Sequence, residues 1–227
     1  MKSIEVYSLV LEVTRRCNMA CEHCLRGDAQ AVDMQKSLVD LIFKKIDCIS
    51  EVTFSGGEPS LNVPIIDYFM TQADKLGKLP HSFYLVTNGL ENQLELATMM
   101  LKWYDRMDEQ ELCAVAVSRD RFHAPLRRPS IIETLTFCRP DKTHDAESSD
   151  RWVISAGRAL DNGIGVQAPD SLEFCVDEDG DTLYIDSLYV SANGLCAGNC
   201  DAAYEDIDEE GVPLSRLRTY LRSKCRV

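Results

Sequence analysis

Three cysteines near the start of the chain, Cys17, Cys21 and Cys24, have the spacing best suited to chemistry. They form the pattern C-x3-C-x2-C on a short loop that follows an apolar stretch, residues 6–13. Three thiolates can bind three irons of a cubane cluster, whereas an electron-transfer cluster uses four. The fourth iron is then open, as a catalytic metal site keeps one position open for its substrate. The spacing therefore indicates a catalytic iron–sulfur cluster.

Structural zinc is the competing interpretation of this loop. His23 lies beside Cys24, so that Cys17, Cys21, His23 and Cys24 could be taken for a set of four zinc ligands. Structural zinc sites usually draw their ligands from two separated pairs of residues. Two adjacent side chains do not easily reach one tetrahedral ion. The motif favours a cluster, and zinc stays open as an alternative.

Length and composition predict a single globular unit. At 227 residues, the chain is long enough for one large domain and too short for two substantial ones. No apolar run approaches the roughly 20 residues of a membrane span. Residues 1–5 are not a basic region followed by an apolar signal segment, so we expect a cytoplasmic protein without membrane partners. In that compartment the ten cysteines are not expected to form a disulfide framework.

The charge of the chain is strongly negative and uneven. The net charge is −13, and residues 131–227 alone carry 9 basic and 19 acidic side chains. An acidic surface repels phosphate backbones, so nucleic acid is an unexpected partner. One dense basic patch is made of Arg119, Arg121, His123, Arg127 and Arg128. It could bind an anionic group of a substrate or pair with the acidic surface, and both interpretations stay open.

Strands and helices alternate regularly through the first half of the chain. The predicted strands are 4–13, 51–54, 82–86 and 112–117. The predicted helices are 37–46, 65–76 and 90–107. Repeated strand–loop–helix units predict parallel strands joined by crossover helices. The loops after the strands should then gather on one face, where such barrels place their active sites.

The second half of the chain is less regular. Residues 151–155 are predicted to be a fifth strand, and the polar residues 138–150 before them a loop. Two apolar runs, 172–176 and 182–186, flank an Asp-Gly turn and predict a β-hairpin. Residues 212–224 are predicted to form a short helix.

The cysteine loop resembles the cluster-binding loop of the radical S-adenosylmethionine enzymes. In that family the open iron chelates the methionine moiety, and one electron cleaves the sulfonium to a 5′-deoxyadenosyl radical. The resemblance spans about residues 6–159. It implies an α/β fold, an incomplete (β/α)6 TIM-like barrel in residues 1–165, with a C-terminal β-hairpin and short helix in residues 166–227. It also implies a 4Fe-4S cluster, S-adenosylmethionine, and a reductant such as flavodoxin or ferredoxin.

The loop after the second strand carries a further match. Ser55, Gly56, Gly57 and Glu58 resemble the family's Gly-Gly-Glu-Pro motif, whose backbone and carboxylate receive the methionine ammonium. Two glycines let the backbone approach a ligand closely. Without the cysteines, the same four residues would be an ordinary turn.

Weaker matches follow the other strands. By resemblance, Asn88, Ser118 and Asp120 would reach the ribose and the substrate, Arg158 would pair with the methionine carboxylate, and His23 would lie against the adenine. Hydroxyl and carboxylate groups suit vicinal hydroxyls, and a guanidinium suits a carboxylate. A turn, a helix N-cap and a surface arginine or histidine are the alternatives for these residues.

A second cluster is a further possibility in the C-terminal region. Cys196 and Cys200 form a C-x3-C pair, which Cys175 or Cys225 could assist. No complete four-cysteine set surrounds the pair, so we predict that an obligatory second cluster is not bound there.

The function that the resemblance implies is an oxidoreductase- or transferase-type enzyme that abstracts hydrogen from a peptide or a small metabolite. One alternative is an activating protein that places a radical on a glycyl-radical enzyme. Another, from a different class, is an iron–sulfur or zinc protein that only binds or senses. The substrate does not follow from the sequence.

Overall fold

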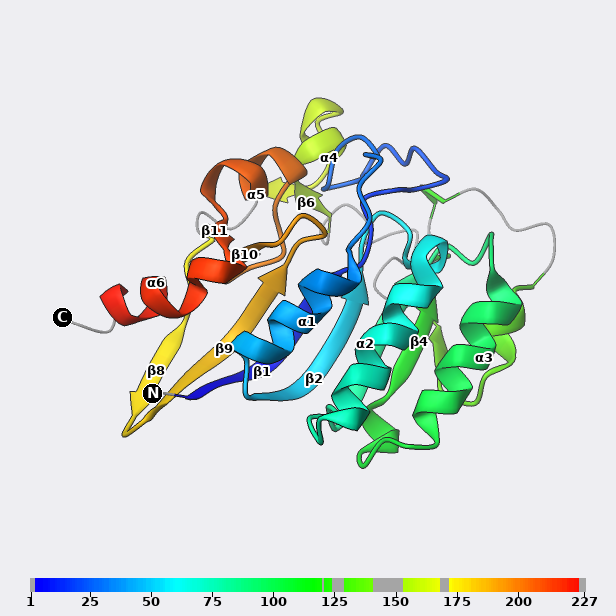
Figure 1. Cartoon of the computed structure of the whole chain (residues 1–227). Helices are drawn as coiled ribbons and strands as arrows, with labels where there is room; N and C mark the ends of the chain where they lie inside the picture. The colour runs from blue at the N-terminus through cyan, green and yellow to red at the C-terminus, as the bar shows by residue number, and fades with distance from the viewer. Residues whose placement is uncertain (1–2, 120, 124–128, 141–152, 168–171, 225–227) are drawn as a thin grey trace.

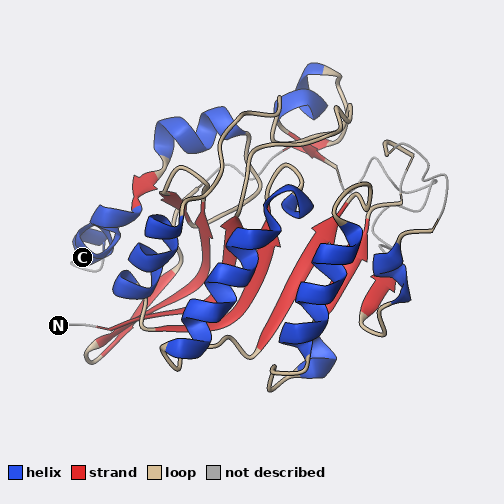
Figure 2. Ribbon diagram, turned by 45° about the vertical axis from the view of Figure 1, so that its right-hand side comes forward, coloured by secondary structure: helices blue, strands red, loops and turns tan. Residues whose placement is uncertain are grey.

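The computed structural model describes residues 3–119, 121–123, 129–140, 153–167 and 172–224. A twisted sheet is covered on one face by three helices (Figures 1 and 2). The first five strands are β1 (Ser3–Glu12), β2 (Cys48–Ser55), β3 (Ser82–Thr87), β4 (Ala114–Val117) and β5 (Cys138–Pro140). The covering helices are α1 (Lys36–Lys45), α2 (Val63–Lys75) and α3 (Gln93–Tyr104).

The later elements are shorter. They are β6 (Ile154–Ser155), α4 (Gly157–Asp161), β7 (Val166–Gln167), β8 (Val176–Asp179), β9 (Thr182–Val190), β10 (Leu195–Ala197), α5 (Tyr204–Glu210), β11 (Val212–Pro213) and α6 (Leu217–Lys224). Short 3-10 turns are η1 (Pro59–Asn62), η2 (Gln110–Leu112), η3 (Ile131–Thr134) and η5 (Leu214–Arg216). Among the described helices, none is both long and apolar enough to cross a lipid bilayer.

The main sheet confirms the predicted fold class. Its order is β11-β10-β9-β1-β2-β3-β4-β5, and it is not closed into a ring. The six strands from β9 to β5 are parallel to one another. The carboxyl ends of β1 to β4 therefore lie along one edge, as the alternation of strands and helices predicts.

The core lies between the sheet and the three helices. The alternating apolar residues of each strand face the apolar stripe of a helix. Phe69 of α2, for example, has its ring centroid 4.9 Å from that of Phe43 in α1 and 5.8 Å from that of Phe54 in β2. This packing fixes the ends of the strands, and with them the loops that carry the polar motifs.

The prediction of a fifth barrel strand at 151–155 is wrong. Ile154–Ser155 forms β6, which pairs with β7 in a separate two-stranded sheet. The strand beside β4 is β5, which lies in the stretch predicted to be a loop. β5 has three residues, too few to show any periodicity, and it is a strand because β4 supplies its hydrogen-bonding partner.

The predicted C-terminal hairpin is confirmed, and its second strand also pairs with the first strand of the main sheet. β8 and β9 are antiparallel neighbours. β9 also pairs with β1 in parallel, from Ser3 opposite Thr182 to Leu11 opposite Val190. The sixth parallel strand of the sheet therefore lies next to the first strand, instead of following the fifth. Residues 172–224, here called the C-terminal segment, thus reach the edge of the sheet that carries the cysteine loop.

Candidate active site

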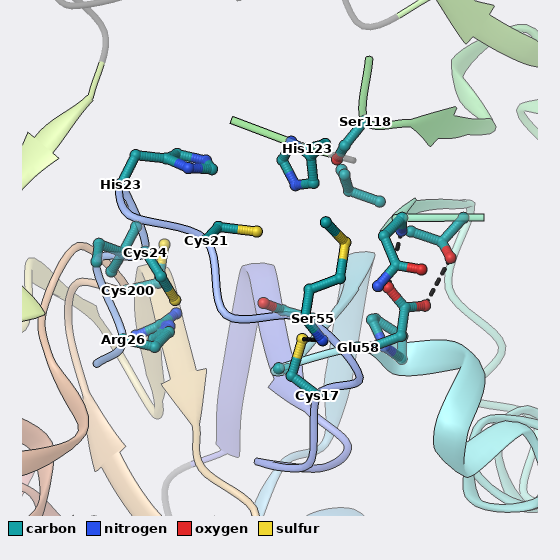
Figure 3. Close-up of a pocket in the computed structure, with 18 of the residues that line it drawn as sticks. Cys17, Cys21, His23, Cys24, Arg26, Ser55, Glu58, Ser118, His123 and Cys200 are labelled. Carbon is teal, nitrogen blue, oxygen red and sulfur yellow. Dashed lines mark hydrogen bonds between the residues drawn. The ribbon is translucent and has the colours of Figure 1, made fainter. Parts of the chain in front are cut away.

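A hollow of about 410 Å³ lies where the loops after β1, β2, β3 and β4 meet (Figure 3). Its lining contains most of the residues singled out from the sequence: Cys17, Cys21, His23, Cys24, Ser55, Gly56, Gly57, Glu58, Asn88, Ser118 and Arg158. These residues come from five separate stretches of the chain. The loops therefore meet at one face, as predicted, for those candidate residues that the structure describes. Asp120 lies outside the described residues.

The cysteine loop, residues 14–28, is held against the loop after β2. The backbone N–H of Gly57 donates to the carbonyl of Thr14 at 2.8 Å, and that of Glu58 to the carbonyl of Arg16 at 2.8 Å. A Cβ added at Gly57 would lie 2.5 Å from the Arg16 carbonyl oxygen. The two chains approach so closely that Gly57 has no room for a side chain. The glycine is required here by the cysteine loop, an explanation that the sequence did not suggest.

The three cysteines fit a cluster better than a single metal ion. All are half-buried thiols that line the same hollow. Among the described residues, no three His, Cys, Asp or Glu side chains are gathered closely enough to bind one ion. A cubane cluster does not need three side chains that converge on one ion, because each cysteine binds a different iron. Burial raises the pKa of the Cys17 thiol, so cluster binding would release a proton from it.

Glu58 links two of the loops that line the hollow. The residue is 2 % exposed, and its carboxylate accepts hydrogen bonds from Thr87 Oγ1 at 2.6 Å, from the Asn88 backbone N–H at 2.8 Å and from the Ser60 N–H at 3.0 Å. The side chain of Asn88 in turn donates to Asn18 Oδ1 of the cysteine loop at 2.7 Å. A carboxylate has about four acceptor positions. Glu58 thus keeps one for a further donor while it holds the loops in place.

Replacing Glu58 by Gln should weaken both the fold and cofactor binding. One carboxylate oxygen becomes an NH2 group, which then faces an N–H or O–H donor in a buried site. The expected loss of folding free energy is about 1–3 kcal/mol. The loss of the charge-assisted bond to an ammonium should weaken S-adenosylmethionine binding by roughly tenfold to a hundredfold.

Urea unfolding of the cluster-free chain and cofactor titration of the reconstituted chain measure the two effects separately. Glu22→Gln is the matched control, because Glu22 is an exposed carboxylate on the same loop. Unchanged stability and unchanged affinity in Glu58→Gln would show that neither role is correct.

Ser118 follows β4 and lines the hollow, with its backbone N–H donating to the Thr87 carbonyl at 2.9 Å. The basic patch is only partly described, because Arg127 and Arg128 lie outside the described residues. Arg119 Nε donates to Glu133 at 3.0 Å, so its charge is already paired. Of the described members of the patch, His123 lines the hollow.

His23 belongs to an aromatic cluster that the sequence did not reveal. Its imidazole stacks on the ring of Phe122 with the centroids 4.4 Å apart, and lies 5.1 Å from that of His123. Figure 3 shows His23 and His123 extending over the hollow. Phe122 thus stacks against one face of the His23 ring. In the sequence, the position of Phe122 between Arg121 and His123 is the one feature that could have indicated this stacking on His23.

Arg158 is brought to the cysteine loop by α4. Its backbone N–H donates to the carbonyl of Cys24 at 3.0 Å, and a Cβ added at the preceding Gly157 would lie 2.4 Å from the Gly27 nitrogen. Nη1 lies 3.2 Å from the Asp28 carboxylate. Nε is buried and has no hydrogen-bond partner among the described residues. A buried N–H without an acceptor fits an anionic group of a ligand in the hollow.

The C-terminal segment adds lining residues that sequence reasoning did not place there. Cys200 and Asp201 of this segment line the hollow, and so does Arg26 of the cysteine loop, which sequence reasoning also left out. Cys196, in contrast, is fully buried in the main core, and burial raises the pKa of its thiol strongly. The two cysteines of the C-x3-C pair therefore have different surroundings. Cys175 is exposed and lines another hollow of about 360 Å³, and Cys225 lies outside the described residues.

These surroundings lead us to expect one cluster per chain. Iron and sulfide assays after reconstitution should give about four of each, because Cys17, Cys21 and Cys24 are the set of three cysteines that lines one hollow among the described residues. The double variant Cys196→Ala, Cys200→Ala should keep the same iron content. A value near eight that falls by half in the double variant would show that a second cluster is bound.

The comparisons with known proteins identify the family. The family model of the radical SAM superfamily matches residues 11–137. A GTP 3′,8-cyclase of Streptomyces coelicolor is 25 % identical over 201 residues, 81 % of this chain and 54 % of that protein. An uncharacterised protein of Methanocaldococcus jannaschii is 35 % identical over 63 residues, 26 % of this chain and 22 % of that protein. The chain thus spans about half or less of the curated relatives it matches.

A solved structure supports the fold. The crystal structure of BtrN in complex with AdoMet and 2-DOIA aligns with a TM-score of 0.53 and 15 % identity, over 95 % of this chain and 80 % of that one. At this identity the likeness concerns the fold alone. The family model covers more than half of the sequence, and the chain therefore belongs to the radical SAM superfamily, whose members are enzymes.

Proposed function

We propose that the chain binds a 4Fe-4S cluster through Cys17, Cys21 and Cys24, binds S-adenosylmethionine beside it, and abstracts hydrogen from a peptide or a small metabolite. The observation that carries the proposal is that the three cysteines line one hollow together with the Gly-Gly-Glu loop. When bound, the cluster would supply the electron that cleaves the cofactor to methionine and a 5′-deoxyadenosyl radical.

The other lining residues then take roles that their geometry supports. The remaining acceptor position of Glu58 suits the methionine ammonium, and the unpartnered Nε of Arg158 suits the methionine carboxylate. Ser118 suits the ribose, and the imidazole ring of His23 suits the adenine. Asn88 and the backbone of residues 55–57 would shape the pocket around these groups, and Asp120 remains a candidate from sequence alone.

The substrate class is proposed only as a peptide or a small metabolite. The similarity to a GTP 3′,8-cyclase makes a nucleoside triphosphate worth including among the compounds tested. The alternative function is activation of a glycyl-radical enzyme, for which the test compound is a partner protein. In either case, we propose a flavodoxin or ferredoxin as the natural reductant.

Anaerobic reconstitution tests the proposal. After addition of iron, sulfide, a reductant and S-adenosylmethionine, the chain should form 5′-deoxyadenosine. A stoichiometric zinc content in anaerobically purified protein, without 5′-deoxyadenosine from the reconstituted protein, would contradict the proposal and favour the zinc alternative. Acceleration of cofactor cleavage by a candidate compound would then identify the substrate class.

A further inference from the structure

Arg26 is a buried cation two residues after Cys24. The residue is 9 % exposed and lines the main hollow. Its Nη1 donates to the carbonyl of Ala202 at 2.9 Å, and its guanidinium carbon lies 4.8 Å from the centroid of the Tyr189 ring. Figure 3 shows the side chain beneath Cys24 and Cys200. The positive charge is therefore fixed beside the cysteine loop by the C-terminal segment.

The charge of Arg26 has no ion-pair partner in the part of the chain that the structure describes. Glu12 is the fully buried carboxylate of this region, and it already accepts from Arg15 Nε at 2.8 Å and from the Tyr189 hydroxyl. Arg15 also pairs with Asp208 at 2.8 Å. Asp208 is 39 % exposed, so water solvates its charge, whereas Glu12 and Arg15 are both buried and balance each other. Among the buried charges named here, Arg26 is therefore left as the extra cation. A buried charge without a counter-charge is costly, so a negative group is expected next to it.

We infer that Arg26 compensates the negative charge of the cluster held by Cys17, Cys21 and Cys24, and so makes that cluster easier to reduce. The inference rests on the proposed function. Reduction adds one negative charge, and a fixed cation in a water-poor site stabilises the reduced state more than the oxidised one. Net charge and burial are among the properties that set the potential of an iron–sulfur cluster.

The other charged groups around the hollow differ from Arg26. Arg158 also carries a positive charge near the cysteines, but its side chain is 20 % exposed and contacts the exposed Asp28 carboxylate, so water screens its charge more than that of Arg26. Glu58 lies on the opposite side of the hollow from Arg26 in Figure 3 and is held by three donors. Asp201 also lines the hollow and would act in the opposite direction. Arg26 is thus the enclosed cation whose removal should change the potential most.

A purely structural role for Arg26 makes a different prediction. The residue also ties the cysteine loop to the C-terminal segment, since the Tyr204 N–H donates to the Arg26 carbonyl at 3.2 Å. If Arg26 only positioned the loop, its loss would lower the iron content and leave the potential of the remaining clusters unchanged. The midpoint potential therefore separates the two roles, with Arg26→Lys as the variant that keeps the charge.

The test is an EPR-monitored redox titration of the reconstituted full chain without S-adenosylmethionine. Arg26→Gln should lower the equilibrium constant for reduction about tenfold, which is about 59 mV for one electron. Arg26→Lys should stay near the wild-type potential. The matched control is Arg16→Gln, because Arg16 is even nearer a cysteine in sequence, directly before Cys17, but is half-exposed and paired with Asp33 at 2.9 Å. Its shift should be much smaller, since solvent screens its charge.

A second variant predicts the opposite sign and covers the case in which Arg26→Gln does not retain iron. Glu12→Gln preserves the shape of the buried carboxylate and removes its charge, so it should raise the potential. Equal potentials in wild type, Arg26→Gln and Glu12→Gln would overturn the inference, as would equal shifts in Arg26→Gln and Arg16→Gln. A wild-type chain that binds no cluster at all would instead overturn the proposed function, and the inference with it.

Discussion

Replacing Cys17, Cys21 or Cys24 by Ala is expected to abolish formation of 5′-deoxyadenosine. Each thiolate binds a different iron of the proposed cubane, so the loss of one leaves two ligands and two unprotected irons. Cys200 is the only further cysteine among the described residues that line the hollow, so none of these is placed to substitute for all three. Iron content, the visible spectrum and cofactor cleavage should all fall together in each variant.

Two other cysteines provide controls for this experiment. Cys48 and Cys175 are exposed thiols that do not line the main hollow. Their Ala variants should keep the wild-type iron content and cofactor cleavage. If the triple variant of the loop still bound four irons and formed 5′-deoxyadenosine, the cluster would have to be elsewhere in the chain. Loss of iron in Cys200→Ala alone would show that the C-terminal segment contributes a ligand.

The elements that sequence reasoning placed well have strong local signals. β1, α1, α2 and β3 are long enough to show their periodicity, and the structure keeps them within a few residues of the predicted bounds. The predicted helix at 90–107 is shorter in the structure, where α3 covers Gln93–Tyr104. Asn92, just before it, has a φ of 49°, a left-handed conformation that cannot continue a right-handed helix.

The parts that the sequence did not predict depend on pairing between distant residues. β5 is a strand only because it lies beside β4. Nothing in the sequence of β9 indicates that its parallel neighbour is β1. Neither pairing has a local signal in the sequence, because register and neighbour are set by the whole core. The same holds for the hollow, where a motif shared with a family identifies the cysteines but not Arg26 or Cys200.

The roles of single residues were harder to predict than their location. Gly57 was expected to admit a ligand, and the structure shows that the Arg16 carbonyl also requires a glycine there. Glu58 was expected to face the cofactor, and the structure adds three donors that use most of its acceptor capacity. Gly57 and Glu58 thus each stabilise the fold and also shape the site. Their contribution to the fold follows from contacts between loops, which the motif does not reveal.

The end of β1 is joined to the C-terminal segment by a buried network of charges. Glu12 and Arg15 are almost completely buried and lie 2.8 Å apart, and the Glu12 carboxylate also accepts from the Ala192 N–H at 2.9 Å. Arg15 extends to Asp208 through Nη1 and Nη2, at 2.8 and 2.9 Å, and its guanidinium lies 4.5 Å from the ring centroid of Tyr204. The network thus fixes the first residues of the cysteine loop to α5.

Replacing Arg15 by Met should lower the free energy of unfolding by about 3–5 kcal/mol, because it leaves Glu12 buried without its counter-charge. The loss is measured as a shift in the urea midpoint of the cluster-free chain at an unchanged slope. Asp208→Asn is the matched control. Arg15 lowers the pKa of Asp208, yet that side chain is 39 % exposed, and Arg15 keeps Glu12 and Gln30 as partners without it. The control should therefore lose much less, since water solvates the exposed end of the network. Equally small losses in the two variants would mean that the network acts as a surface pair and that α5 does not hold the cysteine loop through Arg15. An equally large loss in Asp208→Asn would mean that the exposed end of the network contributes as much as the buried end.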